Sequence, residues 1–446
     1  MDAERDLTPA DRVVLLLRQL GIARAHFLMG ADVAAAYPET AASLALVVPD
    51  DLAPLHLRTL VAELTLAVPP LVIHDEGGRF ASAVPAVLAA YPGLVAVPLR
   101  GYPALLWSDI IADRAEAVAA ALLPHLAEAA RRAPLPPVQP PAEEGEVAGI
   151  TYQARGSGPP LLLFPLYLAP SQWEPLLPTL AEHYCTLTLG GPYLGLVKLL
   201  ELRASGGYGP LVDALIDALA VPAGGTVLDV GCGSGVVARR LARRTDPATR
   251  VVSVDINAYL LREAAALARR EGVADRITFR AGNTLALPFP DASFDAAIAC
   301  TVLEELDADR ALAELARVVR PGGRIAVAVR ADDLPHWDSL PLRPAVRAKV
   351  LAAMGTPGAS AGGCDDASLY RRFRALGLAD VAMGPRFAVD APQPALREFF
   401  AGLAAGSVAA LDAAEGTEWQ AVAAQAEAEG SYLWGMCYHC AVGTKP

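Results

Sequence analysis

The sequence is poor in charged residues, in cysteine and in uninterrupted apolar segments. Charged residues make up 19% of its 446 residues and apolar ones 54%, which leaves little room for extended disorder and indicates a globular chain. No apolar run reaches the roughly 18 residues of a membrane span, and the stretch 60–73 is broken by Glu63, Pro69 and Pro70. Six scattered cysteines do not form a disulfide framework, and the N-terminus lacks a signal-peptide layout. The sequence therefore favours a reducing, cytoplasmic location.

Positive charge is also scarce. The formal net charge of −12 disfavours a nucleic-acid partner, because neutralising a phosphate backbone needs clustered Lys and Arg. Arginine pairs do occur within helical patterns, where we expect them on solvated faces: residues 131–132, 239–240 and 243–244. Neither a nucleic acid nor a membrane is predicted as a partner.

Proline-rich and glycine-rich stretches divide the chain, whose length favours two to three domains. The clearest break is residues 133–146 (APLPPVQPPAEEGE), where closely spaced prolines stop any helix and predict an extended linker. A weaker break at residues 203–210 (RASGGYGP) precedes a predicted helix. We expect one domain over residues 1–200, with the linker inside it, and a second over residues 205–446.

Short apolar runs alternate with helical patterns in the first 200 residues. Runs such as ARAHFLMG and PPLVIHDE predict buried strands, and DRVVLLLRQLG and residues 80–91 predict helices. Such alternation predicts a parallel sheet covered by helices. These segments resemble the α/β-hydrolase family in a circularly permuted order. Residues 150–191 resemble its opening strands and first helix, and the first 130 residues resemble its second half.

The catalytic residues of a hydrolase are missing from this region. A nucleophile elbow needs G-x-S-x-G at a strand-to-helix turn, but the matching strand ends in residues 29–32 (MGAD). Residues 164–165 (FP) replace the usual His-Gly turn, and residues 101–103 (GYP) stand where a histidine is needed. Without a nucleophile and a base, this region lacks the residues that acyl transfer requires. We expect a scaffold, a dimerisation surface that would make a homodimer, or a substrate gate.

A glycine-rich loop follows an apolar strand at residues 226–235 (TVLDVGCGSG). The strand ends in Asp229, and the glycines at 231, 233 and 235 precede a helical pattern. Glycine permits positive φ and close approach of a ligand, and a helix start offers free N–H groups to an anionic end. Other nucleotide-binding folds share such a loop, so the loop alone is weak evidence for one ligand. Asp255, at the end of the next strand, is a second indication of a ligand that contains a nucleoside. Its carboxylate can accept both hydroxyls of a ribose.

Further strands follow in order. RITFRAG leads to Asn283, residues 295–300 form a fourth strand, and an RPGGR turn precedes a fifth, IAVAVRADD. Over residues 207–332 this series resembles the class I S-adenosylmethionine-dependent methyltransferases, in particular the branch of ubiquinone-biosynthesis and small-molecule methyltransferases. The resemblance implies a Rossmann-like, doubly wound α/β sheet with S-adenosylmethionine as cofactor. It implies methyl transfer to a small-molecule acceptor, either a metabolite or a natural product.

The resemblance also assigns cofactor-binding residues at the strand ends. They are Asp229, Gly231, Cys232, Gly233, Gly235, Asp255, Ile256, Asn283, Thr284 and Cys300. The resemblance implies that the loop and Asp229 bind the methionine part of the cofactor. It implies that Asp255 binds the ribose and Asn283 the adenine edge. Cys300 and Thr301 are implied to lie near the sulfonium. The family most often has Asp in place of Asn283, although an Asn carbonyl can still accept from the adenine amino group.

Base candidates come from loops at the carboxyl ends of strands. Glu305, which follows Glu304 in TVLEEL, stands where the related branch often has His. His336 lies beside an aromatic residue after the fifth strand and suits a general base near neutral pH, with a solvated loop histidine as the alternative. Methyl transfer mainly needs alignment and the exclusion of water. Activity therefore does not depend on either residue being a base.

The remaining segment, residues 331–430, is expected to supply a helical lid over the acceptor. Within it DVAMGPRFAV predicts a strand, and MCYHCAVGTKP after it predicts the final antiparallel strand. Aromatic residues close to the lid favour a flat or apolar acceptor: Tyr432, Trp434 and Tyr438.

The cysteines leave one alternative chemistry open. Thiolates of Cys232, Cys300 and Cys364 could hold a metalloid, as in arsenite methyltransferases. Cys437, His439 and Cys440 suggest a metal site, but a C-x-x-C pair supplies only two ligands and alternate strand residues point to opposite faces, so we expect none there. A non-catalytic S-adenosylmethionine-binding or sensory protein is the second function class, and a hydrolase is the third.

Overall fold

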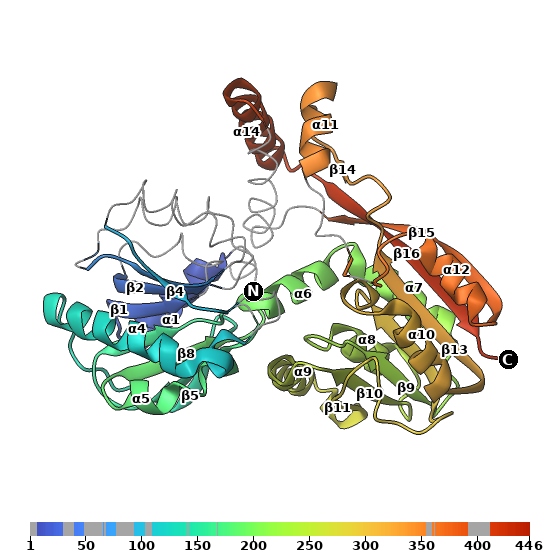
Figure 1. Cartoon of the computed structure of the whole chain (residues 1–446), viewed down its shortest axis with the longest axis horizontal. Helices are drawn as coiled ribbons and strands as arrows, with labels where there is room; N and C mark the ends of the chain where they lie inside the picture. Colours follow the sequence, from blue (N-terminus) through green and yellow to red (C-terminus); the bar gives the residue numbers. More distant parts are fainter. Residues whose placement is uncertain are drawn as a thin grey trace. The chain divides into compact units, whose positions relative to one another are not determined.

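A computed structural model describes residues 7–29, 40–48, 66, 68–76, 93–102, 109–140, 142–166, 168–353, 359–360, 362–390 and 411–446. Within them the chain forms two compact units, which we call the N-terminal unit (Met1–Lys198) and the C-terminal unit (Leu199–Pro446). Each unit is built around its own sheet (Figure 1). The boundary lies within α6 (Gly195–Ser205), and the break expected at residues 203–210 corresponds to the connection between α6 and α7 (Tyr208–Leu219).

The sheet of the N-terminal unit has the order β4-β3-β2-β1-β7-β8-β6-β5. Its strands are β1 (Ala25–Met29), β2 (Ala41–Val48), β3 (Leu71–Asp75), β4 (Val95–Leu99), β5 (Glu144–Val147), β6 (Ile150–Arg155), β7 (Pro160–Leu163) and β8 (Cys185–Gly190). Neighbours are parallel except at β6, which is antiparallel to both β8 and β5. The central strands β1, β3, β7 and β8 are buried along their whole length, as expected of a parallel sheet covered on both faces.

Helices cover this sheet. They are α1 (Pro9–Gln19), α4 (Ile110–Arg132), α5 (Leu177–Ala181) and the 3-10 helix η2 (Pro170–Trp173). The helix α4 packs on β2, β3 and β4 through an apolar stripe that includes Val118, Leu122 and Leu126. The predicted parallel α/β architecture is therefore present in this unit.

Two parts of the sequence prediction for this unit need comment. Residues 144–146, assigned to the linker, instead begin the edge strand β5, because Glu144 and Glu146 pair with Gln153 and Thr151 of β6. The predicted helix 80–91, residues 30–32 of the expected elbow and Pro103 lie outside the described residues. The α/β-hydrolase resemblance stays a prediction.

The sheet of the C-terminal unit has the order β11-β10-β9-β12-β13-β16, with β15 on the other side of β16. Its strands are β9 (Thr226–Val230), β10 (Arg250–Asp255), β11 (Ile277–Ala281), β12 (Phe294–Cys300), β13 (Val319–Arg330), β14 (Trp337–Asp338), β15 (Ala379–Asp390) and β16 (Trp434–Thr444). The strands from β11 to β13 are parallel, and β16 is antiparallel to β13, β14 and β15.

Helices cover both faces of this sheet. Besides α7 they are α8 (Val236–Arg244), α9 (Ala258–Arg270), α10 (Ala308–Val318) and α12 (Ser368–Ala375), with the 3-10 turns η3 (Ala274–Arg276) and η4 (Leu303–Glu305). Two further helices, α11 (Pro344–Ala353) and α14 (Ala413–Ala428), belong to a separate apolar cluster that includes Trp434 of β16. Val227 belongs to one buried cluster, with α7 and α8, and Leu228 to another, with α10 and α12. Successive strand residues point to opposite faces. The expected doubly wound, Rossmann-like sheet is confirmed.

The segment expected to be a helical lid is only partly helical. Residues 379–390 belong to the sheet as β15, which pairs with β16 from Ala379 opposite Thr444 to Asp390 opposite Trp434. The strand predicted there is confirmed, and these residues are not part of a helical lid, because their backbone pairs with β16. Residues 391–410 lie outside the described residues. In the part of the chain that the structure describes, no helix has the length and apolarity to cross a membrane.

Candidate functional site

The loop between β9 and α8 is held in a left-handed backbone conformation by its glycines. The φ angles are +68° at Gly231, +52° at Gly233 and +77° at Gly235, a region that favours glycine. A Cβ atom on Gly231 would overlap the side chain of Val302. The N–H groups of Gly231 and Cys232 donate to the carbonyl of Val254 at 2.8 and 3.1 Å. The loop is thus fixed between β10 and the segment that follows β12.

Asp255 joins this loop to the end of β10. Its Oδ2 accepts from the N–H of Gly233 at 2.8 Å, and its Oδ1 accepts from the N–H of Asn257 at 2.8 Å. Burial raises the pKa of this carboxyl, while these hydrogen bonds pull the pKa down. Each oxygen keeps a second acceptor position for a hydroxyl. The neighbouring Ile256 side chain is 76% exposed and offers an open apolar surface.

Asp229 is the buried acid of the site. It is 1% exposed, and its Oδ2 accepts from the hydroxyl of Ser253 at 3.3 Å. Burial is the main cause that raises the pKa of Asp229 to about 7, with the nearby Asp255 carboxylate adding to the shift. An acid with so high a pKa gains from a positive partner, since a cation stabilises its charged form.

Asn283 and Thr284 follow β11, the strand next to β10. The Oδ1 of Asn283 accepts from the N–H of Leu285 at 2.8 Å and so shapes its own turn. The Asn283 residue is exposed and Thr284 is buried. Because β11, β10 and β9 are consecutive and parallel, Asn283, Asp255 and Asp229 come from adjacent strands.

Cys300 and Thr301 lie at the end of β12, on the other side of β9. Thr301 has a φ of +56°, which is unusual for a β-branched residue. Its hydroxyl donates to the carbonyl of Cys300 at 2.7 Å and accepts from Nη2 of Arg203 at 3.1 Å. Burial raises the pKa of the thiols of Cys232, Cys300 and Cys364. The thiol form is therefore favoured, which weighs against the thiolate chemistry of the arsenite alternative.

The two base candidates occupy different surroundings. Glu305 is exposed and pairs with Nη2 of Arg330 at 3.1 Å. The ring of His336 stacks on Trp434, with centroids 5.8 Å apart, and burial lowers the pKa of this histidine. No hydrogen bond joins His336 to Glu305 or to Cys300 in the described chain, so the structure does not bring these predicted residues together.

Glu304 contrasts with its neighbour Glu305. The Glu304 side chain is buried, and its Oε1 accepts from the N–H of Arg330 at 2.7 Å. Its Oε2 is out of contact with solvent and has no hydrogen-bond partner among the described residues. Burial raises the pKa of Glu304 to about 7. The sequence favoured Glu305 as the base candidate, and no local pattern indicated that Glu304 is the buried acid.

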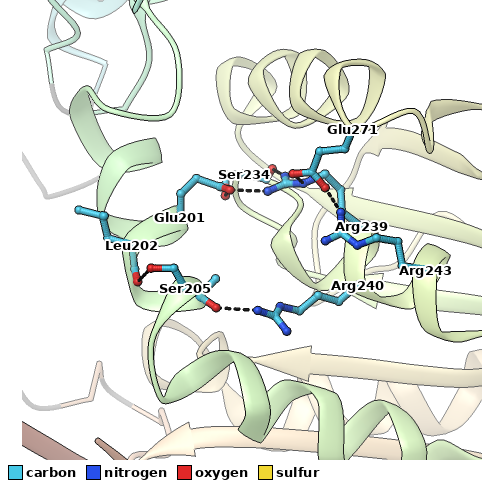
Figure 2. Close-up of polar contacts among 9 residues, drawn as sticks. Glu201, Leu202, Ser205, Ser234, Arg239, Arg240, Arg243 and Glu271 are labelled. Carbon is cyan, nitrogen blue, oxygen red and sulfur yellow. Dashed lines mark hydrogen bonds and ion pairs between the residues drawn. The ribbon is translucent and has the colours of Figure 1, made fainter. Parts of the chain in front are cut away.

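Sequence reasoning missed a buried arginine behind the glycine loop (Figure 2). Arg239 of α8 pairs with Glu201 of α6 at 2.5 Å and with Glu271 at 2.9 Å, and its Nη1 donates to the carbonyl of Ser234. The Ser234 hydroxyl donates to Glu201 at 2.7 Å. The expected solvated face is wrong for Arg239, which is 2% exposed. We call Glu201, Ser234, Arg239 and Glu271 the arginine clamp.

The cysteines and the histidine of β16 do not form a ligand set. His439 is buried between two partners, with Nε2 2.6 Å from Oδ1 of Asp333 and Nδ1 2.8 Å from the hydroxyl of Tyr370. Over the described ranges, no three His, Cys, Asp or Glu side chains are grouped so that they could hold a metal ion.

The chain is similar to known methyltransferases. Residues 228–327 match the family described as "Methyltransferase domain". A ubiquinone/menaquinone biosynthesis C-methyltransferase from Hahella chejuensis is 42% identical over 113 residues, which are 25% of this chain and 45% of that protein. The 27-O-demethylrifamycin SV methyltransferase of Amycolatopsis mediterranei is 37% identical over 118 residues, 26% of this chain and 43% of that protein.

Among solved structures, the YcgJ protein from Bacillus subtilis is 19% identical with a TM-score of 0.38, covering 53% of this chain and 98% of that one. The match spans less than half the length of the two curated relatives named above. The family match lies within the C-terminal unit, whose sheet has the Rossmann-like strand order.

Proposed function

We propose that the protein transfers the methyl group of S-adenosylmethionine to a small-molecule acceptor. One observation carries this proposal. The Gly233 N–H donates to Asp255, so the loop expected to hold an amino-acid end and the acid expected to hold a ribose form one cradle. Both curated relatives named above are methyltransferases by their names.

The residues of the cradle fit the cofactor chemically. The buried Asp229 carboxyl would gain from the ammonium group, and the free acceptor positions of Asp255 suit the ribose hydroxyls. The carbonyl of Asn283 can accept a second hydrogen bond, from the adenine amino group, and Ile256 can pack on the ring. The bound cofactor would supply an electrophilic methyl group on a sulfonium. The chain's own task is then to orient the acceptor and exclude water.

Proton removal from the acceptor falls to groups after β12 and β13. Glu305 and His336 remain the candidates from the sequence. We add Glu304, because a carboxyl with a pKa of about 7 can accept or release a proton near neutral pH.

The N-terminal unit is proposed to be a scaffold, dimerisation surface or substrate gate in a cytoplasmic protein. The strand order of the N-terminal sheet supports the prediction of a circularly permuted, hydrolase-like domain. The strands of residues 144–190 and those of residues 25–99 meet at the parallel pair β7 and β1, so two halves in exchanged sequence order share one sheet.

Calorimetric titration of the full chain with S-adenosylmethionine, followed by detection of S-adenosylhomocysteine with a panel of small acceptors, tests the proposal. Binding and acceptor-dependent turnover are expected. Binding without turnover on any acceptor would favour the sensory alternative, and the absence of binding would overturn the proposal. Ester hydrolysis that survives Asp229→Ala would instead revive a hydrolase.

A further inference from the structure

A carboxylate on α6 supports the middle of the glycine loop. Glu201 accepts from the Ser234 hydroxyl at 2.7 Å through Oε1 and from Nη2 of Arg239 at 2.5 Å through Oε2, so both of its oxygens are engaged (Figure 2). Ser234 is 1% exposed, and its carbonyl accepts from Nη1 of Arg239 at 2.5 Å. One residue of the loop is therefore held twice, at its hydroxyl by α6 and at its carbonyl by α8.

The residues on either side of Ser234 explain why the loop needs this support. Gly233 and Gly235 both have positive φ, and glycine loses more backbone entropy on ordering than any other residue. A Cβ atom on Gly233 would lie 3.0 Å from Cδ1 of Leu200, the residue before Glu201, so α6 also packs on the loop at this point. A loop of this composition keeps one conformation only where its neighbours fix it.

The support from α6 reaches Asp255 through the loop backbone. Ser234 directly follows Gly233, whose N–H donates to Oδ2 of Asp255 at 2.8 Å. A shift of Ser234 would carry Gly233 with it and change this hydrogen bond. Asp255 is the acid proposed above to hold the ribose, so Glu201 can affect the cradle without touching a ligand. Fixing a binding loop in advance lowers the entropy that is lost when the ligand binds.

We infer that Glu201 is a positioning residue for the cofactor, whose contact with Ser234 holds the glycine loop in the conformation that binds; this inference rests on the proposed function. The helix α6 precedes the family match in the chain, so the support comes from outside the matched residues. The boundary between the two units lies within the same helix. The affinity for the cofactor therefore depends on the segment that connects the N-terminal unit to the C-terminal unit.

Calorimetric titration of the full chain with S-adenosylmethionine compares two variants that each remove one carboxylate from Arg239. Glu201→Gln should raise the Kd about tenfold, the effect expected for one hydrogen bond to a charged group. Glu271→Gln is the matched control, because its carboxylate pairs with Arg239 and Arg243, which both belong to α8. It should keep the wild-type Kd, while melting curves report the stability that each variant loses. An equal change of Kd in both variants overturns the inference, because the clamp would then only stabilise the fold.

Ser234→Ala tests the same contact from the loop side, and it replaces Glu201→Gln if that variant does not fold. It removes the hydroxyl and leaves the pair of Glu201 with Arg239 in place. The Kd should again rise. The double variant should lose no more affinity than the weaker-binding single variant, because both changes break one contact. Single effects that multiply in the double variant would contradict the inference.

Amide hydrogen exchange gives a readout that a purely structural role of Glu201 would leave unchanged. Because coupling between a ligand and a contact is reciprocal, saturating S-adenosylhomocysteine should slow exchange in residues 200–204 more than in α10, on the opposite face of the sheet from α8. Glu201→Gln should abolish this difference, and the absence of selective protection in the wild type overturns the inference. Failure of the wild type to bind S-adenosylmethionine at all would instead overturn the proposed function, and this inference with it.

Discussion

The carboxyl ends of β7 and β9 show how two similar sheets differ in chemistry. In the N-terminal unit, β7 is followed by Phe164 and Leu166, which are both fully buried, and the indole N–H of Trp173 donates to the carbonyl of Phe164 at 2.6 Å. In the C-terminal unit, β9 is followed by the glycine loop, with Asp229 and Asp255 beside it. Apolar side chains fill the first strand end, whereas at the second the glycines let Val302 and the Asp255 carboxylate approach the loop backbone.

One ion pair from each unit shows a second contrast, in burial. Arg131 and Glu128 of α4 pair on the surface, with side chains 68% and 37% exposed. Arg239 of the arginine clamp is paired while almost wholly buried. The shared architecture therefore does not determine function, which depends on the residues placed at the strand ends and on what braces them.

Breaking the arginine clamp should have the largest effect. Arg239→Met leaves the carboxylates of Glu201 and Glu271 without their buried partner, and we expect a loss of about 3–5 kcal/mol in the free energy of unfolding. Arg131→Met in the N-terminal unit should leave stability unchanged, because its pair is solvated. Urea unfolding followed by circular dichroism measures both. Equal losses would show that the buried and surface pairs do not differ as the structure indicates.

The pH dependence of stability should also distinguish the units. The pKa of Glu304 is about 7 in the folded protein, above its ordinary 4.5, so its stabilising contribution is complete below about pH 4.5 and is lost as pH rises through 7. Glu304→Gln removes this dependence. Relative to wild type, the variant should gain stability between pH 5 and 8, by about 3 kcal/mol at most. Melting temperatures across this range measure the gain. Glu128→Gln should show no such trend, and a flat difference for Glu304→Gln would contradict the prediction.

Asp255→Asn should weaken cofactor binding. Its two oxygens both accept backbone N–H groups, whereas the amide of Asn would set a donor against one of them. We expect the Kd for S-adenosylhomocysteine to rise tenfold to a hundredfold, or about 1.4–2.7 kcal/mol. The control is Asp113→Asn in the N-terminal unit, whose carboxylate accepts from the hydroxyl of Tyr102 at 2.6 Å. Calorimetry should find its affinity unchanged, and an equal loss in both would count against a role for Asp255.

The sequence predicted those features that depend on residues close together in the chain. The glycine loop, Asp255 and the succession of strands along the chain follow from patterns of ten residues or fewer, and the structure has them. Arg239 was misread because its partners Glu201 and Glu271 lie 38 and 32 residues away, so its helical spacing looks like that of a solvated arginine. The surroundings of His336 depend on Trp434, from a distant strand. Glu304 rather than Glu305 is buried, and its Oε1 accepts from the N–H of Arg330, 26 residues later in the chain. Local periodicity does not encode a contact over that separation.

The smallest effect compares one glycine from each unit. Gly231 and Gly101 have φ angles of +68° and +61°, so alanine is strained at both, by about 1 kcal/mol. A Cβ on Gly231 would also overlap Val302, whereas one on Gly101 meets no described atom within 4 Å. Gly231→Ala should therefore lose about 1–3 kcal/mol more than Gly101→Ala in denaturant unfolding. Equal losses would mean that Val302 moves aside freely, and the loop would then be less constrained than its contacts indicate.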